Sequence, residues 1–233
     1  MIPILLALQA DTLRARAESA LDLLVKGGIV MIPIAVCSIV VVAVAVDRFI
    51  RLRRNRVAPP GLARGLRDIL RQPQKPLESA LEHLDDHPPG PLADVLRAGV
   101  HQIPQGPAAV EKAVDDAAAR EAARMQRSLR PLSAVAQLAP LLGLLGTIYG
   151  MITAFQAAAA AGVGKGEQLA SGIYEALLTT AAGLTVAIPA VLAHQILVGK
   201  IDRLIDVLEQ DLEGVLDEVR LRARSREPRR SGP

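Results

Sequence analysis

The chain has 233 residues and a net charge of +3, and 51% of its residues are hydrophobic although only 2% are aromatic. An apolar content made of Ala, Leu, Val and Ile is typical of helices packed in lipid rather than of a globular core. The shortage of aromatic side chains argues against nucleic-acid binding, because single strands are held by stacking on aromatic rings. The one cysteine, Cys37, cannot form an intrachain disulfide.

An N-terminal segment leads into the first long apolar stretch. Residues 1–26 begin with a short apolar run without a basic start or a convincing cleavage site, which favours an interfacial helix over a signal peptide. Gly27–Val46 then carries no charge over 20 residues, which is long enough to cross a bilayer. We therefore predict transmembrane helix 1 at residues 27–50.

A proline-rich region at residues 51–130 follows the first span. Its prolines occur in groups, a pattern that predicts short helices separated by turns. Pro107 suits the first turn of a helix, and the residues after it predict a helix that runs straight into the second span. We interpret residues 51–130 as a cytoplasmic helical region.

Two further spans are predicted in the second half of the chain. Pro131–Gly164 contains no Asp, Glu, Lys, Arg or His over 34 residues, which predicts transmembrane helix 2 at 131–162 and an outer turn at 163–167. Transmembrane helix 3 is predicted at 168–199. Apolar residues at three- and four-residue steps predict a cytoplasmic amphipathic helix at 200–222, and residues 223–233 read as a basic disordered tail.

Basic residues cluster at one end of each predicted span, and such clusters face the cytoplasm in membrane proteins. The clusters are Arg48, Arg51, Arg53, Arg54 and Arg56 after the first span, Arg120, Arg124, Arg127 and Arg130 before the second, and Lys200 and Arg203 after the third. The N-terminus is thus predicted to face outward and the C-terminus inward. The expected fold is an all-α membrane protein with three transmembrane helices, two of them extended into the cytoplasm, plus short cytoplasmic helices.

Glu175 is the only acidic side chain inside the third predicted span. An ionised side chain at the centre of a spanning helix costs about 2.5 to 3.5 kcal/mol on insertion scales, and intramembrane acids usually line proton or ion paths. Glu175 is therefore a candidate for an ion pathway.

Small residues recur on the second and third spans, where they let helix backbones approach closely. We predict helix packing at Gly143, Gly146, Gly150, Gly172 and Gly183. The threonines have two interpretations: Thr147 and Thr180 either bond their own preceding carbonyls or line a pore. At 100° per residue, Thr179 lies about 40° from Glu175 and Thr180 about 140° away, so either the pore is wide or one threonine packs.

Catalysis and metal binding find little support in the sequence. Ser171 and His194 lie about 34 Å apart along a continuous helix, too far for a catalytic dyad. His83 and His87 have a spacing that permits a shared metal, but the acidic, proline-rich surroundings favour a solvated loop. We expect a protein that is not an enzyme and needs no cofactor or metal.

Three motifs resemble the second and third spans of the MotA/TolQ/ExbB proton-channel family, and the ExbB/TolQ branch is the closer match. They are LGTIYG at Leu145–Gly150, GIYEALLTTAAGL at Gly172–Leu184 and AIPA at Ala187–Ala190. The first span, from Gly27-Gly28 to Asp47-Arg48, is similar as well, although Asp47 stands where Glu is more usual in the family.

The resemblance implies a homopentamer in the bacterial inner membrane, with the N-terminus periplasmic, enclosing an ExbD- or TolR-like single-span partner. A TonB- or TolA-like protein that spans the periplasm would complete the complex. Glu175, Thr147 and Thr180 match pore-lining positions of the family, and Thr179 is an additional pore-lining candidate. The implied function is a proton channel that couples the proton motive force to a partner's work, such as nutrient import through outer-membrane receptors or envelope maintenance.

Two other functions stay open from the residues alone. In a non-conducting membrane scaffold, the glycines and threonines would only pack and Glu175 would anchor the helix at the interface. A small-solute permease predicts inverted repeats and broken helices, which the sequence does not contain. The residues also leave open whether the ion is H⁺ or Na⁺ and which process is energised.

Overall fold

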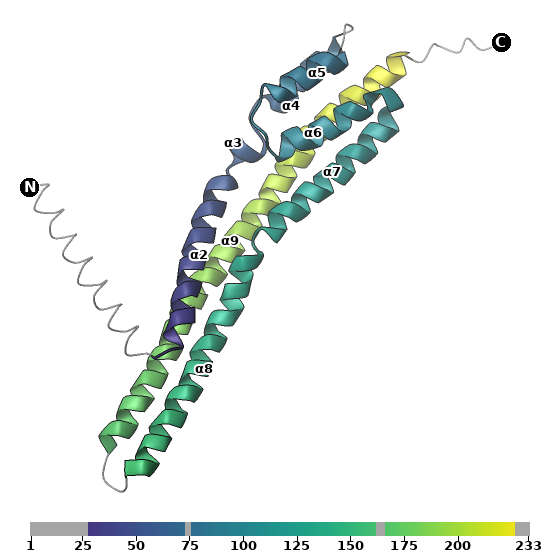
Figure 1. The fold of residues 1–233 in the computed structure, drawn as a ribbon. Coiled ribbons are helices and arrows are strands. Elements are labelled where there is room, and N and C mark those ends of the chain that lie inside the picture. Colours follow the sequence, from purple (N-terminus) through teal and green to yellow (C-terminus); the bar gives the residue numbers. More distant parts are fainter. Residues whose placement is uncertain (1–27, 73–75, 162–165, 227–233) are drawn as a thin grey trace, which may run out of the picture. The chain divides into compact units, whose positions relative to one another are not determined.

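The computed structural model describes residues 28–72, 76–161 and 166–226, and every regular element in these ranges is a helix (Figure 1). Three helical stretches are long and apolar enough to cross a membrane: Met31–Arg51, Pro107–Ala160 and Leu169–Arg224. The predicted fold class is therefore confirmed. The predicted interfacial helix within residues 1–26 lies outside the described residues, as do most of the outer turn and residues 227–233 of the tail.

The chain divides into two compact units. The first unit comprises the chain up to Ala45 together with Pro131–His194, and the second comprises Val46–Arg130 together with the chain from Gln195 onward. Helix α9, Gly166–Arg226, is 61 residues long and contributes to both units. Helix α9 thus extends to Arg226, into the segment 223–233 that was predicted as a disordered tail. Just before this segment, Arg222 donates hydrogen bonds to the carbonyls of Leu70 and Gln72.

In the first unit, α8 (Arg130–Ala161) lies antiparallel beside α9 (Figure 1). A two-residue turn, Ser128–Leu129, precedes α8, whereas the sequence predicted an uninterrupted helix. Pro131 has no N–H to continue the bonding of the preceding helix. The Ser128 hydroxyl also donates to the Met125 carbonyl at 2.6 Å, which helps to end the helix.

The contact between α8 and α9 consists of small residues that face one another in antiparallel register. A Cβ added at Gly183 would lie 2.5 Å from the Ala139 carbonyl oxygen, and one at Gly150 would lie 2.9 Å from the Ala176 Cβ. Towards the other end of the pair, Gly172 meets Ala154. The two backbones therefore approach more closely than side chains larger than Ala would allow.

Helix α2, Met31–Arg51, packs its N-terminal half against this pair. Val30, Met31 and Ile34 are buried, and they contact the partly buried residues Leu142, Ala182 and Val186. The register places the start of α2 beside Glu175 of α9, because Gly28 is in contact with that side chain.

The second unit is built from the short helices and the C-terminal part of α9. Its elements are α3 (Arg54–Val57), α4 (Leu62–Arg71), α5 (Pro76–Asp85), α6 (Pro91–Gln102), the 3-10 turn η1 (Ile103–Gln105) and α7 (Pro107–Arg127). The apolar stripe predicted on α9 is buried at Ile201, Leu204, Leu208, Leu212, Val215, Leu216 and Val219.

Ion pairs on the surface join the short helices to α9. Arg71 of α4 donates to Glu218 at 2.9 Å, and this bond raises the pKa of the Arg71 guanidinium. Arg220 donates to Glu111 of α7 at 2.6 Å. Because the arginine of each pair is exposed to solvent, the pairs fix register more than they add stability.

The glycine contacts predict opposite effects for two substitutions in α9. Gly183→Ala should lower the free energy of unfolding by about 1–3 kcal/mol, because the new methyl group collides with the Ala139 carbonyl. The matched control is Gly199→Ala, where nothing lies within 4 Å. It should raise stability by about 0.5–1 kcal/mol through helix propensity alone. Thermal unfolding of the purified protein in detergent measures both, and equal shifts would contradict the packing.

Candidate functional site

Three threonine hydroxyls gather around two backbone carbonyls in the contact between α8 and α9. The Thr147 and Thr180 hydroxyls are hydrogen-bonded to each other across the two helices. The Gly143 carbonyl lies 3.1 Å from the Thr180 hydroxyl and 3.2 Å from that of Thr147. The Ala176 carbonyl lies 2.7 Å from the Thr179 hydroxyl and 3.2 Å from that of Thr147. We call these three threonines and two carbonyls the hydroxyl cluster.

The hydroxyl cluster has more acceptors than protons. Each hydroxyl donates one hydrogen bond, whereas the carbonyls and the hydroxyl oxygens can all accept. Thr147 can direct its proton to Gly143, to Ala176 or to Thr180, since all three acceptors lie within hydrogen-bond distance. The hydroxyls can therefore change direction without leaving a proton unpaired. Thr147 bonds its own preceding carbonyl, that of Gly143, as the first interpretation of the threonines expects, whereas Thr180 bonds the Gly143 carbonyl of the opposite helix.

Thr179 differs from its neighbours in the cluster. Its side chain is only 1% exposed and packs against Gly146, where an added Cβ would lie 2.6 Å from the Thr179 Cβ. Thr147 and Thr180 are partly buried and reach the rim of the contact. Burial within a single chain favours a packing role for Thr179 over a pore-lining one.

Glu175 lies outside the hydroxyl cluster. It is half-buried on α9, about 7.5 Å along the helix axis from Thr180, and its carboxylate contacts Gly28 at the start of α2. Within the described ranges, the Glu175 carboxylate has no hydrogen bond or ion pair. The structure thus brings Thr147 and Thr180 together and directs Glu175 towards a different neighbouring helix.

Gly28 is the site residue that the sequence reasoning missed. Its φ of +70° is a left-handed conformation that non-glycine residues adopt at a cost, and an added Cβ would collide with the Glu175 carboxylate. The sequence signal was the Gly27-Gly28 pair at the start of the first span, which was read as part of the span and not as a contact for Glu175.

The histidine pair occupies a more ordered environment than the solvated loop that was predicted. His83 belongs to α5, which buries Ala80 and Leu84 fully, and its Nε2 lies 3.3 Å from the Leu62 carbonyl oxygen. His87 Nδ1 lies 2.8 Å from the carbonyl of His83. In the part of the chain that the structure describes, no group of three or more potential metal ligands occurs.

The fold and the site define a three-span, all-helical membrane protein with a polar cluster between its second and third spans. Residues 88–210, which include the hydroxyl cluster and Glu175, match the MotA/TolQ/ExbB proton channel family. The chain belongs to this family. Family membership makes it an inner-membrane protein and places it among channel subunits associated with transport rather than among enzymes.

Named relatives come from both the ExbB and the TolQ groups. An ExbB-like biopolymer transport protein of Synechocystis is 36% identical over 181 residues, which cover 76% of this chain and 70% of that protein. The Tol-Pal system protein TolQ of Haemophilus influenzae is 35% identical over 119 residues, covering 49% and 50%. The biopolymer transport protein exbB1 of Vibrio cholerae is 31% identical over 204 residues, covering 85% and 87%.

The contact between Gly28 and Glu175 can be tested by adding one methyl group. Gly28→Ala should displace the Glu175 side chain and raise its labelling by a hydrophobic carbodiimide severalfold, because the carboxyl group loses its place against α2. Peptide mass spectrometry measures the labelled fraction. Gly61→Ala is the control: Gly61 has a φ of +96° but nothing within 4 Å. The Gly61→Ala variant should lower the free energy of unfolding by about 1–3 kcal/mol through backbone strain, and it should leave the labelling of Glu175 unchanged. Equal labelling in all three proteins would contradict the contact.

Proposed function

We propose that this chain is the channel-forming subunit of an inner-membrane complex that uses the proton motive force to drive work by a partner across the periplasm. The observation that carries the proposal is the pairing of Thr147 and Thr180 across two spanning helices, one and a half turns from the intramembrane carboxylate of Glu175. A carboxylate can bind and release a proton, and hydroxyls that can change direction can pass one on.

The lumen of this channel lies between copies of the chain. Within one protomer, α8 and α9 are in direct contact through their small residues, which leaves no passage between them. The first unit exposes large apolar side chains, for example Ile29 at 81% and Ile39 at 69%. Such surfaces need lipid or other helices around them. A ring of identical subunits, a pentamer as in the ExbB branch, provides both environments.

A second protein transmits the work. The family resemblance and the relatives' names support an ExbD- or TolR-like single-span helix inside the ring and a TonB- or TolA-like protein that reaches through the periplasm. One elementary charge that crosses 100 mV releases about 2.3 kcal/mol, so a few protons per cycle are enough for a substantial conformational change. Import of large nutrients and envelope maintenance are the two processes that the family resemblance implies.

The proposed orientation places the second unit in the cytoplasm and the N-terminus in the periplasm. It is supported by the basic residues at the ends of the spans, since such clusters are retained on the cytoplasmic side. In this orientation Glu175 lies near the outer end of the third span.

A non-conducting scaffold is the second candidate, and one observation favours it. All three threonine hydroxyls find hydrogen-bond partners inside a single protomer, as a purely structural cluster would. The two functions differ in what happens when the site is neutralised. A scaffold needs only the packing to be retained, whereas a channel also needs groups that exchange protons.

Neutralising the site should separate conduction from assembly. The double variant Glu175→Gln with Thr180→Val should lower proton uptake at least about tenfold in everted membrane vesicles that contain the complex with its partner. The variant loses the proton-binding carboxylate and one of the paired hydroxyls but keeps side chains of similar volume. A pH-sensitive dye reports uptake in sodium-free medium, and copurification of the partner reports assembly.

The matched control carries the same two changes elsewhere on α9. Glu167→Gln with Thr185→Val removes an exposed carboxylate in the first turn and a hydroxyl that bonds only its own Ala181 carbonyl at 2.7 Å. It should leave uptake at the wild-type level. Full uptake and full energy coupling in the Glu175 and Thr180 variant would reject the pore assignment and favour the scaffold.

A further inference from the structure

A basic cavity lies in the second unit, next to the last turn of α2. Its volume is about 600 Å³, and its walls come from the end of α2, from α3, from the start of α6 and from the end of α7. Four arginines line it, namely Arg48, Arg51, Arg56 and Arg124, and Asp94 and Glu121 are its only carboxylates in the described chain. The cavity therefore has an excess of positive charge.

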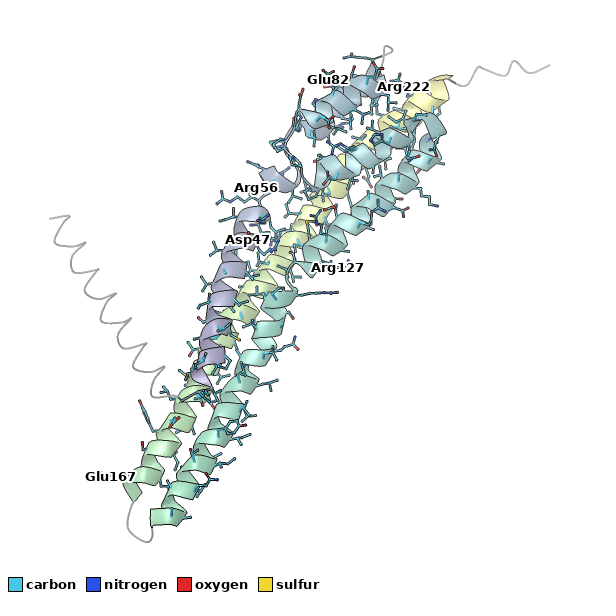
Figure 2. All side chains as sticks on the ribbon, in the orientation of Figure 1. Asp47, Arg56, Glu82, Arg127, Glu167 and Arg222 are labelled. Atoms are coloured by element: carbon cyan, nitrogen blue, oxygen red, sulfur yellow. The ribbon has the colours of Figure 1, made fainter. Side chains whose placement is uncertain are left out.

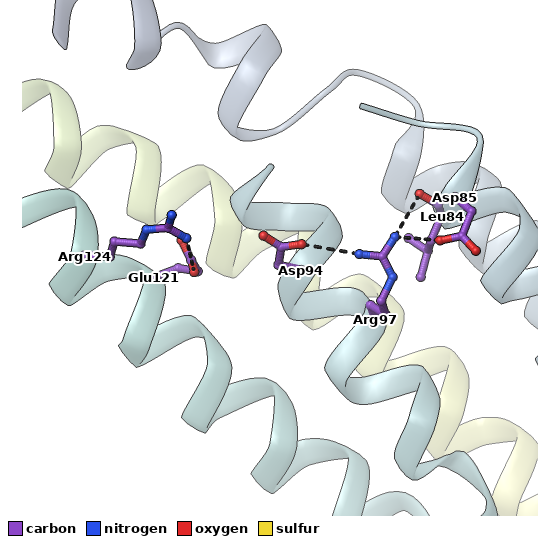
Figure 3. A network of polar contacts seen from close by, with 6 residues as sticks. All are labelled: Leu84, Asp85, Asp94, Arg97, Glu121 and Arg124. Atoms are coloured by element: carbon purple, nitrogen blue, oxygen red, sulfur yellow. Dashed lines mark hydrogen bonds and ion pairs between the residues drawn. The ribbon is translucent and has the colours of Figure 1, made fainter. Parts of the chain in front are cut away.

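The two carboxylates of the cavity are already engaged (Figure 3). Asp94 accepts a hydrogen bond from Arg97 at 3.4 Å, and Arg97 also donates to Asp85 at 2.7 Å. Glu121 accepts one from Arg124 at 3.5 Å. These pairs hold the acids at the wall, which leaves the guanidinium groups near α2 and α3 to interact with a ligand.

Two of these guanidinium groups, those of Arg48 and Arg56, are incompletely paired. Arg48 Nε is buried and forms an ion pair with Asp47 Oδ2 at 3.4 Å, but it has no hydrogen-bond partner among the described residues. The hydrogen bond to Asp47 comes from Arg51, at 2.6 Å. Arg56, labelled in Figure 2, belongs to α3 and lines the cavity. It forms no ion pair within residues 28–72, 76–161 and 166–226. A buried guanidinium N–H without an acceptor is costly, and an anion would satisfy it.

The backbone around the cavity holds its walls in place. An added Cβ at Gly90 would lie 2.5 Å from the Arg56 carbonyl oxygen, so α3 and the start of α6 are in close contact. Gly90 is the N-cap of α6 and has no side chain to cap the helix. The positive end of the α6 dipole adds to the attraction that the arginines exert on an anion.

We propose that this cavity binds the phosphate of an anionic phospholipid headgroup. Arginine side chains recognise phosphate oxygens through paired N–H groups. Arg48 and Arg51 lie in the last turn of an apolar helix long enough to span the membrane, so the cavity lies at the level of the headgroups. The buried residues Leu52, Val57 and Met125 also line it and suit the start of an acyl chain. A volume of about 600 Å³ is much larger than a single phosphate ion requires.

The test counts bound lipid on the full chain. Protein purified in a neutral detergent is titrated with phosphatidylglycerol or with phosphatidylcholine, and native mass spectrometry counts the lipids retained per protomer. The wild-type protein should retain phosphatidylglycerol at least about tenfold more strongly. Arg48→Gln with Arg56→Gln should weaken that retention about 30-fold, at roughly fivefold per arginine.

The control is a double variant that also removes two positive charges, from the same stretch of the chain around the junction of α2 and α3. Arg53→Gln with Arg54→Gln changes two exposed arginines that do not line the cavity. It should weaken retention no more than about threefold. Equal losses in both double variants would overturn the proposal, because they would show general attraction to a basic surface. Binding of inorganic phosphate that depends on Arg48 and Arg56, without a preference for phosphatidylglycerol, would overturn the assignment to a lipid. The number of lipids counted by mass spectrometry does not depend on proton conduction. The experiment can therefore reject the lipid site without rejecting the proposed channel function, and the reverse also holds.

Discussion

The close approach of α8 and α9 is the constraint on which the site depends. Small residues at four- and three-residue steps on each helix let the backbones come near enough for Thr147 and Thr180 to meet. In lipid, helices gain little from burying apolar side chains against each other, so close packing and hydrogen bonds between helices decide their association. The hydroxyl cluster is one product of that packing. It is located where the Gly143 carbonyl is accessible from the opposite helix.

Glu175 is held by a different contact, and this separation matters for the proposed function. Its carboxylate lies against the start of α2, whereas the threonines lie between α8 and α9. A proton that uses both Glu175 and the threonines would pass from the carboxylate to hydroxyls about one and a half helical turns away. Because this distance is too long for a direct hydrogen bond, groups of a neighbouring helix or water must lie in between. In the proposed ring, the partner's helix and the adjacent subunits supply these groups. In the proposed function, a single chain supplies some groups of the pathway and the assembled complex supplies the others.

Much of this arrangement could be predicted from the sequence, for physical reasons. Uncharged runs of 18 residues or more mark the spans, and the family motifs identify Glu175, Thr147 and Thr180 as candidates. The angle of about 140° between Glu175 and Thr180 already separated them onto different faces. Three features could not be read from the sequence. Gly28 contacts Glu175, which is far away in the sequence. The turn at Ser128–Leu129 depends on a local hydrogen bond. The cavity at Arg48 is built from four separate helices. Periodicity reports which face of a helix is apolar, but it does not report what lies opposite.

A structure of the assembled complex with its partner in a lipid bilayer tests the central claim most directly. The account predicts several copies of this chain around a central lumen, with Glu175 and the Thr147–Thr180 pair facing a helix of the partner inside it. Side chains of Glu175 that point at acyl chains or bulk solvent, around a closed centre without a lumen, would contradict the account.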